Sequence, residues 1–178
     1  MSHALVLVLG GTRSGKSRFG SQRAAALAGS APVTYLATAK PGDPELDQRI
    51  ASHRQVRPPD WPTVEVADDL AVTIGAVGDE RTILLDGLTL WLSAAFDPDR
   101  TDVEGFIAGP LARALESIER RRGAIVIVSD EIGLGMVPMD AGARAFRDLI
   151  GIAHQRIAAT ADEVYLMVAG LPMALKPV

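Results

Sequence analysis

The sequence predicts an α/β fold: a doubly wound, mostly parallel β-sheet with helices on both of its faces. The first observation is that short runs of Val, Ile and Leu alternate along the chain with segments of helical periodicity. The second is a glycine-rich turn, GGTRSGKS, between the first apolar run and the first helical segment. The chain has 178 residues without an internal repeat or a linker, so we expect a single domain over residues 1–178.

In the first half of the chain, four apolar runs predict strands of the sheet. Aliphatic and β-branched residues dominate these runs, which span residues 4–9, 33–37, 63–66 and 82–86. Residues 16–27 predict a helix that ends near Gly29, since glycine commonly terminates helices. Residues 40–62 mix Pro, Asp and Arg around a short helical piece at 44–54. We expect an excursion from the sheet there, and long excursions are often functional.

The second half begins with an expected loop over residues 97–105. A helix should follow from about Pro110, a residue favoured in a first helical turn, to Arg122. The run Arg120–Arg122 before Gly123 is typical of cations and a glycine cap at the end of a helix.

Residues 124–129 and 163–168 predict two further strands, the second of which we expect to be the last of the sheet. Between them lie a glycine-rich turn, 133–138, and a long helix that Asp140 can cap. The side chains at helical spacing that form its core face are Phe146, Leu149, Ile150, Ala153 and Ile157. His154 lies next to this face, and we expect it at the surface or in an interface.

Composition excludes several classes of function. The net charge is −4 and the basic residues are scattered, so nothing indicates a nucleic-acid partner. The chain has no cysteine, which excludes disulfides, zinc thiolates and thiol nucleophiles and is consistent with a cytoplasmic location. No stretch approaches the roughly 20 apolar residues of a membrane-spanning helix.

The turn from Gly10 to Ser17 fits the phosphate-binding loop (P-loop) pattern and indicates a P-loop NTPase-like fold. Backbone N–H groups of such a turn point at an anion, and the helix N-terminus adds the positive end of its dipole. We expect Lys16 to reach the outer phosphates of a nucleotide and the Ser17 hydroxyl to hold Mg²⁺. The alternative is a closely packed turn that binds nothing. The residues of this predicted site are Gly10, Gly11, Thr12, Arg13, Ser14, Gly15, Lys16 and Ser17.

Two carboxylates follow predicted strands. Asp86 ends the strand 82–86, where P-loop enzymes place the second carboxylate on the Mg²⁺ side, so we expect it near Ser17. The alternative is an aspartate that caps the turn before Gly87. Glu131 follows the strand 124–129 and could face the same cleft, or be a solvated turn residue together with Asp130.

His53 lies among arginines in the segment RIASHRQVRP. A positive field suits a triphosphate, and a neutral imidazole can attack phosphorus to give a phosphoramidate. From these residues alone, a surface histidine at a solvated helix end is the simpler interpretation.

Several segments together resemble one family, the bifunctional adenosylcobinamide kinase and adenosylcobinamide-phosphate guanylyltransferase of cobalamin biosynthesis. They occur in the family's order and cover nearly the whole chain. The most specific are RIASHRQVRPPDWPTVE at 49–65 and DEIGLGMVP at 130–138. The others are GGTRSGKSRF at 10–19, YLATA at 35–39, ILLDGLTLWLS at 83–93, RAFRDLIG at 144–151 and ADEVYLMVAGLPMALK at 161–176.

The resemblance implies two reactions and a set of residues for them. A kinase step would use GTP or ATP, with Mg²⁺, to phosphorylate the aminopropanol hydroxyl of adenosylcobinamide. In the second reaction, His53 would attack the α-phosphate of GTP and pass GMP on to adenosylcobinamide phosphate, with Lys16 as the other catalytic residue. The family also implies a homotrimer. Beyond the loop, the matching nucleotide-contacting positions are Ala37, Thr38, Ala39, Arg54, Gln55, Val56, Arg57, Glu65 and Asp86.

Two alternatives stay open. A plain small-molecule kinase would use the same loop but not His53. A non-catalytic nucleotide-binding protein would bind without turnover. A regulatory GTPase is disfavoured, because the sequence contains no Asn-Lys-x-Asp guanine-recognition motif.

Overall fold

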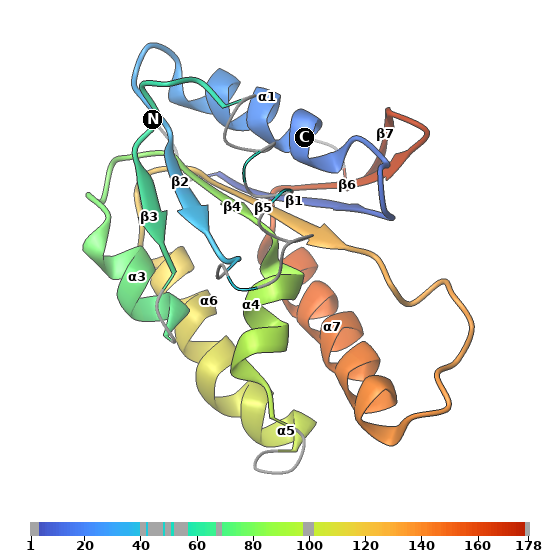
Figure 1. Ribbon diagram of the computed structural model, residues 1–178. Coiled ribbons are helices and arrows are strands. Elements are labelled where there is room, and N and C mark those ends of the chain that lie inside the picture. The colour runs from blue at the N-terminus through green and yellow to red at the C-terminus, as the bar shows by residue number, and fades with distance from the viewer. Residues whose placement is uncertain are drawn as a thin grey trace.

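The computed structural model describes residues 4–39, 42, 48, 51, 57–66, 69–97 and 102–176. Seven strands form one sheet in the order β3-β2-β4-β5-β1-β6-β7 (Figure 1). The strands are β1 (Leu5–Gly10), β2 (Thr34–Ala37), β3 (Thr63–Glu65), β4 (Ile83–Asp86), β5 (Ile125–Asp130), β6 (Glu163–Val168) and β7 (Leu171–Lys176). All neighbouring strands pair in parallel except β6 and β7, which are antiparallel. The predicted mostly parallel sheet is confirmed.

Helices cover both faces of the sheet, as predicted, but unequally. Among the helices of the described residues, α1 (Lys16–Ala28) alone lies on one face, where it contacts β5, β4 and β1 (Figure 1). On the other face lie α3 (Leu70–Ala76), α4 (Leu88–Ala95), α5 (Val103–Phe106), a π-helical turn (Ile107–Leu111), α6 (Ala112–Glu119) and α7 (Ala141–Thr160).

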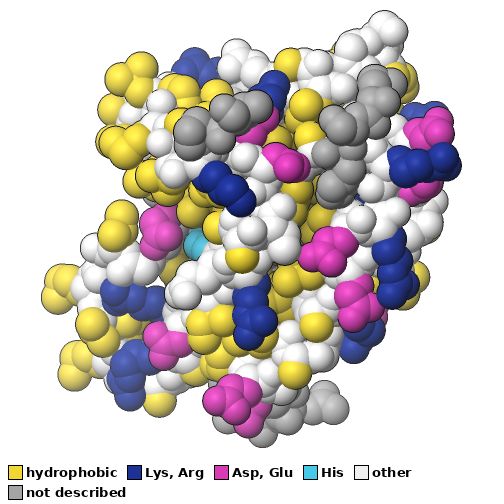
Figure 2. Space-filling model, turned by 180° about the vertical axis from the view of Figure 1, so that it is seen from behind, with side chains coloured by type: hydrophobic (Ala, Val, Ile, Leu, Met, Phe, Trp, Pro, Cys, Tyr) yellow, Lys and Arg dark blue, Asp and Glu magenta, His cyan; other side chains and the backbone are white. Residues whose placement is uncertain are grey.

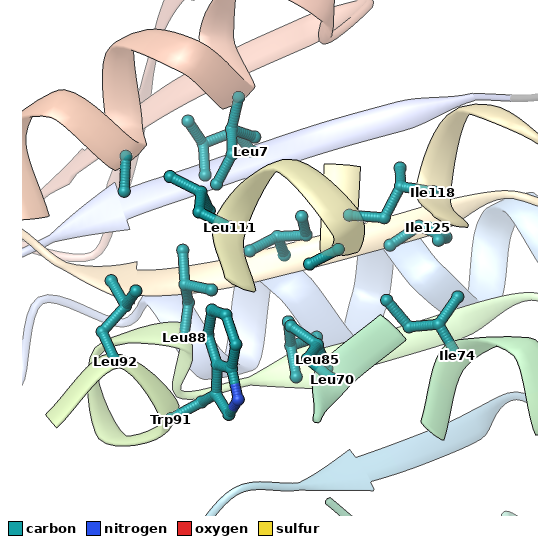
Figure 3. Close-up of a cluster of buried hydrophobic side chains, with 14 of the residues drawn as sticks. Leu7, Leu70, Ile74, Leu85, Leu88, Trp91, Leu92, Leu111, Ile118 and Ile125 are labelled. Atoms are coloured by element: carbon teal, nitrogen blue, oxygen red, sulfur yellow. The ribbon is translucent and has the colours of Figure 1, made fainter. Parts of the chain in front are cut away.

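Alternation along β1 divides the core into two layers. Leu5, Leu7 and Leu9 face the larger layer under α3 to α7, which also contains Phe106. Figure 3 shows part of this layer, with Leu7 and Trp91. Val6 and Val8 face α1. Helix α1 approaches the sheet closely at Gly20, where an added Cβ would lie 2.5 Å from Val128 Cγ2. This close approach fixes the end of α1 that carries the P-loop.

The structure corrects several element boundaries. The strand 163–168 is not the last, because the chain reverses at Ala169 and Gly170, both at positive φ, and adds β7 at the sheet edge. The expected loop over residues 97–105 already contains the start of α5, which Asp102 caps through Gly105 N–H at 2.6 Å. Helix α5 continues through the π-helical turn into α6, so Pro110 lies inside a helical run rather than in a first turn.

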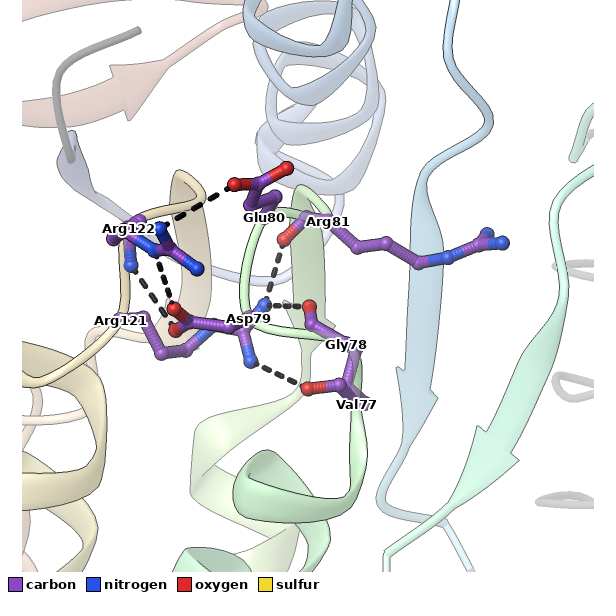
Figure 4. A network of polar contacts seen from close by, with 7 residues as sticks. All are labelled: Val77, Gly78, Asp79, Glu80, Arg81, Arg121 and Arg122. Carbon is purple, nitrogen blue, oxygen red and sulfur yellow. Dashed lines mark hydrogen bonds and ion pairs between the residues drawn. The ribbon is translucent and has the colours of Figure 1, made fainter.

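The run Arg120–Arg122 is a second correction, because the middle arginine is buried rather than a solvated helix-end cation. Arg121 is 5% exposed, and its guanidinium donates to four backbone carbonyls at the end of α3 and in the following turn. Figure 4 shows three of these bonds, to Val77, Gly78 and Arg81. The acceptors are Ile74 O at 3.2 Å, Val77 O at 3.0 Å, Gly78 O at 2.8 Å and Arg81 O at 2.7 Å. Arg120 and Arg122, in contrast, are exposed. The hydrogen bonds of Arg121 connect the end of α6 to the segment that leads into β4.

Apolar side chains are exposed at the edge of the sheet formed by the β6–β7 hairpin and on the segment after β5, as the hydrophobic patches in Figure 2 show. Leu171 is 71% exposed on β7, and Met136 and Met139 are 95% and 99% exposed on the segment that precedes α7. No helix among the described residues is long and apolar enough to cross a membrane.

Candidate functional site

The P-loop joins the carboxyl end of β1 to the N-terminus of α1, as the sequence predicts. Gly15 caps α1 at a φ of 92°, a left-handed conformation that glycine adopts without strain. A side chain at Gly10 would collide with Ser14 Oγ at 2.5 Å and with the carbonyl of Met167 at 3.0 Å. The glycines therefore allow a tight turn that presents backbone N–H groups and the helix N-terminus to one side.

The loop borders a pocket of about 630 Å³. A phosphate group in it would meet the helix N-terminus and a surplus of positive side chains. The lining residues are Thr12, Arg13, Ser14, Gly15, Lys16, Ser17, Arg18, Asp130, Ala169 and Gly170. Ser14 Oγ is buried without a hydrogen-bond partner in the described structure. A buried hydroxyl of this kind is suited to a ligand atom.

Lys16 lies in this pocket against a carboxylate. Its Nζ is 2.6 Å from Asp130 Oδ1 and also donates to Gly11 O at 3.2 Å. Asp130 ends β5, directly opposite Gly10 in the β1–β5 register. The ammonium group is thus held at the mouth of the loop, and a phosphate that binds Lys16 must break its ion pair with Asp130.

Ser17 and Asp86 meet, as predicted for a magnesium site. Ser17 Oγ donates to Asp86 Oδ1 at 3.0 Å, and Tyr35 O–H donates to Asp86 Oδ2 at 3.2 Å. Burial, and then the nearby Asp86 carboxylate, raise the pKa of the Tyr35 phenol, so its hydroxyl stays protonated and keeps donating. A hydroxyl and a carboxylate at this place are the hard oxygen donors that Mg²⁺ accepts.

The positions predicted after β2 lie beside Asp86 at the same edge of the sheet. Ala37 ends β2 opposite Asp86 on β4 and Glu65 on β3. Thr38 Oγ1 donates to Gly87 O at 2.9 Å, which ties the chain after β2 to the chain after β4. Ala39 follows directly and is partly buried.

Arg57 connects the arginine-rich segment to this group of residues. Its guanidinium carbon lies 3.2 Å from the centre of the Tyr35 ring, and Nη1 donates to Thr63 Oγ1 at 2.6 Å. Tyr35 in turn contacts Asp86, so Arg57, Tyr35, Asp86 and Ser17 form one continuous line of contacts. The predicted residues His53, Arg54, Gln55 and Val56 lie outside the described residues.

The chain around Glu131 and His154 differs from expectation. Glu131 is absent from the lining of the pocket, and its carboxylate lies 3.6 Å from His154 Nδ1. His154 is 6% exposed and therefore not a surface residue, because α7 turns it into the core against β5. Its Nε2 lies 2.8 Å from Ser129 Oγ. Burial lowers the pKa of His154, while the Glu131 carboxylate opposes the shift.

Sequence reasoning missed Asp130 and Tyr35 as residues of the site. A signal existed for Asp130, because it ends an apolar strand just as Asp86 does, and the carboxyl ends of parallel strands meet at one edge. Tyr35 carried no such signal, since an aromatic residue inside a strand is first of all a core residue.

Comparison with known proteins now identifies the relatives of this chain. Residues 6–175 match the family described as cobinamide kinase / cobinamide phosphate guanyltransferase. A bifunctional adenosylcobalamin biosynthesis protein, CobP, from Pseudomonas aeruginosa is 44% identical over 96% of both chains. Bifunctional adenosylcobalamin biosynthesis proteins named CobU are 36% identical in Salmonella typhimurium and 37% in Escherichia coli, each over 97% of this chain and 99% of the relative.

Solved structures that resemble this one at low sequence identity confirm the P-loop NTPase fold. The flagellar accessory protein FlaH from Methanocaldococcus jannaschii superposes with a TM-score of 0.55 at 15% identity, covering 99% of this chain and 80% of that one. A solved ATPase domain gives a TM-score of 0.51 at 12% identity, covering 92% of this chain and 69% of that one. Fold, pocket and near full-length relatives agree, and the chain belongs to the cobinamide kinase / cobinamide phosphate guanyltransferase family of transferases.

Proposed function

We propose that this chain carries out both reactions of its family on one P-loop. It phosphorylates the aminopropanol hydroxyl of adenosylcobinamide with GTP or ATP, and then transfers GMP from GTP to adenosylcobinamide phosphate. The observation that carries the proposal is the pocket at the P-loop, with Lys16 inside it and the Ser17–Asp86 contact beside it. Family membership and relatives named as bifunctional cobalamin biosynthesis proteins support the choice of substrates.

In the kinase step the residues of the pocket bind and orient the triphosphate. Backbone N–H groups of the loop hold the phosphates, and Lys16 leaves Asp130 to contact the outer ones. Ser17 and Asp86 would hold Mg²⁺, which neutralises charge on the transferring phosphoryl group when bound. In the described part of the chain no three His, Asp or Glu side chains gather into a metal cluster, and in this proposal phosphate oxygens and water would be the other ligands.

In the guanylyl step, an imidazole nitrogen of His53 attacks the α-phosphorus of GTP. A P–N bond forms, the bond to the leaving oxygen breaks, and pyrophosphate departs. A phosphate oxygen of adenosylcobinamide phosphate then attacks the same phosphorus, the P–N bond breaks and the neutral histidine is regenerated. The placement of Arg57 on Tyr35, one contact from Asp86, supports a role for the arginine-rich segment at this pocket.

The proposal includes self-association as a homotrimer in the cytoplasm. The exposed apolar side chains of β7 and of the segment after β5 support burial of this surface against other copies of the chain.

Lys16→Ala tests the assignment of the pocket to both reactions. We expect both activities to fall at least ~100-fold, because the outer phosphates lose the cation that stabilises their charge in the transition state. The matched control is Lys176→Ala, which removes an exposed lysine whose Nζ donates to Ala158 O at 3.4 Å and Ala159 O at 3.5 Å, near the end of α7 and outside the pocket lining. Radiolabelled GTP distinguishes the reactions, since γ-label reports the kinase step and α-label the guanylyl step. Normal turnover of either label by Lys16→Ala would contradict the site.

A further inference from the structure

A buried line of hydrogen bonds runs from α7 to the rim of the phosphate pocket. His154 Nε2 lies 2.8 Å from Ser129 Oγ, which lies 3.0 Å from Thr89 Oγ1. Thr89 Oγ1 accepts the backbone N–H of Asp130 at 2.9 Å. Ser129 has no exposed surface and His154 is 6% exposed, so solvent does not compete for these bonds. The line ends at the residue whose carboxylate holds Lys16.

The direction of the hydrogen bonds in this line follows from the tautomer of His154. The Asp130 backbone N–H can only donate, and the Glu131 carboxylate, 3.6 Å from His154 Nδ1, can only accept. With the proton of a neutral imidazole on Nδ1, facing Glu131, Nε2 accepts from the Ser129 hydroxyl. Ser129 Oγ in turn accepts from the Thr89 hydroxyl. Each group has a partner, and the peptide unit between residues 129 and 130 is held through the Asp130 N–H.

Serine, histidine and glutamate in this order have the composition of a nucleophilic triad. Burial excludes that interpretation, because no substrate reaches a Ser129 hydroxyl with zero exposure. The line is therefore a support for the end of β5. Glu131 adds to it, since Oε1 accepts the Gly133 N–H at 2.5 Å and stiffens the turn that follows.

What this support holds in place is the Asp130 carboxylate. Of the residues that line the pocket in the described part of the chain, Asp130 carries the only negative charge, beside Arg13, Lys16 and Arg18. Its oxygen lies 2.6 Å from Lys16 Nζ, and the two side chains are only 35% and 14% exposed. A polyphosphate that takes Lys16 must break this pair and then lie next to a carboxylate. A ligand that does not contact Lys16 neither breaks this ion pair nor lies next to the Asp130 carboxylate.

We propose that Asp130 sets the affinity of this pocket for polyphosphate, and that His154, Ser129 and Thr89 are positioning residues that hold Asp130 against Lys16. The Lys16–Asp130 ion pair competes with phosphate for the ammonium group, and triphosphate binds less tightly than the P-loop alone would allow. This eases exchange of nucleotide between two successive reactions. The inference rests on the proposed function, in that the ligand is the GTP of that function.

Calorimetric titration with GTP in EDTA, at fixed ionic strength, tests the role of Asp130. Asp130→Asn keeps the shape of the side chain and removes its charge, so we expect GTP to bind roughly tenfold more tightly. GMP has no outer phosphate for Lys16, and its weaker binding should change much less. Asp140→Asn is the matched control for net charge, because asparagine also caps a helix and Asp140 lies outside the pocket lining. Its affinity for GTP should equal that of the wild type.

A double-mutant cycle tests the positioning residues. His154→Gln and Thr89→Val should each tighten GTP binding by about threefold, because Asp130 loses its support, and neither should have an effect when Asp130 is already Asn. Thr89→Val is nearly isosteric and keeps the test available should His154→Gln fold poorly. Equal effects in both backgrounds would overturn the positioning role, since a merely structural loss does not depend on Asp130. Unchanged or weaker GTP binding by Asp130→Asn overturns the inference and leaves the proposed function intact, whereas a wild type that binds no GTP overturns both.

Discussion

Arg121→Met is the substitution whose effect on stability follows most directly from the structure. The guanidinium donates four hydrogen bonds, at 2.7 to 3.2 Å, to carbonyls that end α3 and form the turn before β4. Methionine keeps an unbranched apolar side chain in the same space but donates to none of them. The substitution thus separates the hydrogen bonds from the packing of the arginine stem.

The expected magnitude is a loss of about 3 kcal/mol in the free energy of unfolding. Hydrogen bonds to a charged group contribute about 1.5–3 kcal/mol each, so four of them would exceed roughly 6 kcal/mol if simply added. Two effects reduce this sum. First, removing a buried charge removes its desolvation cost, and the same burial lowers the pKa of Arg121. Second, water can reach some of the carbonyls in the exposed turn 78–81 and satisfy them. In a chain of this length, about 3 kcal/mol corresponds to a fall in Tm of roughly 6–12 °C.

Urea unfolding of Arg121→Met and Arg120→Met, followed by circular dichroism, measures this difference. Arg120 is one residue away, and its side chain is 80% exposed in a surface pair with Glu116 at 3.2 Å. Its loss should cost less than about 0.5 kcal/mol. Equal unfolding free energies for the two variants would refute the reasoning, because burial and the four carbonyls would then contribute nothing.

Two further predictions concern other buried positions. Gly20→Ala should lower stability by about 1–2 kcal/mol, because its Cβ would lie 2.5 Å from Val128 Cγ2, whereas Gly151→Ala on α7 meets nothing within 4 Å and should raise it by up to ~1 kcal/mol. Thermal unfolding compares the two variants with the wild type, and a change in stability of the same sign for both would contradict the close packing of α1 on the sheet. Burial lowers the pKa of His154, so below the usual histidine pKa of about 6.5 the unfolded chain binds more protons than the folded chain. Stability should therefore decrease as the pH is lowered below that value, by at most about 1.4 kcal/mol per pH unit. His154→Asn should remove that part of the pH dependence in urea titrations from pH ~7 to ~5, while Glu131 and Asp130, which face the ring, remain; an unchanged slope would contradict it.

The fold was predictable because its strands are nearly pure apolar runs and the P-loop marks where the first strand ends. The predictions that were wrong concern features that depend on contacts between segments far apart in the sequence. The β7 strand lacks the alternation of apolar and polar residues that marks a half-buried strand, and it is exposed throughout. Only its antiparallel pairing with β6 identifies it as a strand. Arg121 and His154 look like surface residues in the sequence, because burial of a polar side chain requires partners that come from distant segments.

The site was predictable in part for the same reason. Ser17 and Asp86 could be brought together from the rule that parallel strands end at one edge, and the structure confirms their contact at 3.0 Å. The Lys16–Asp130 pair requires the register of β1 against β5, which no local pattern states. The nucleotide roles of the residues around His53 stay predictions.

The GMP-histidine adduct at His53 is the most direct test of the central claim, that this P-loop serves a guanylyl transfer. The purified chain is incubated with GTP and Mg²⁺, digested, and examined by mass spectrometry, with His53→Asn as the control. The account predicts a GMP adduct on the peptide that contains His53, labile in acid and stable in base, that disappears when adenosylcobinamide phosphate is added. Unmodified His53 in a protein shown to bind GTP would contradict it.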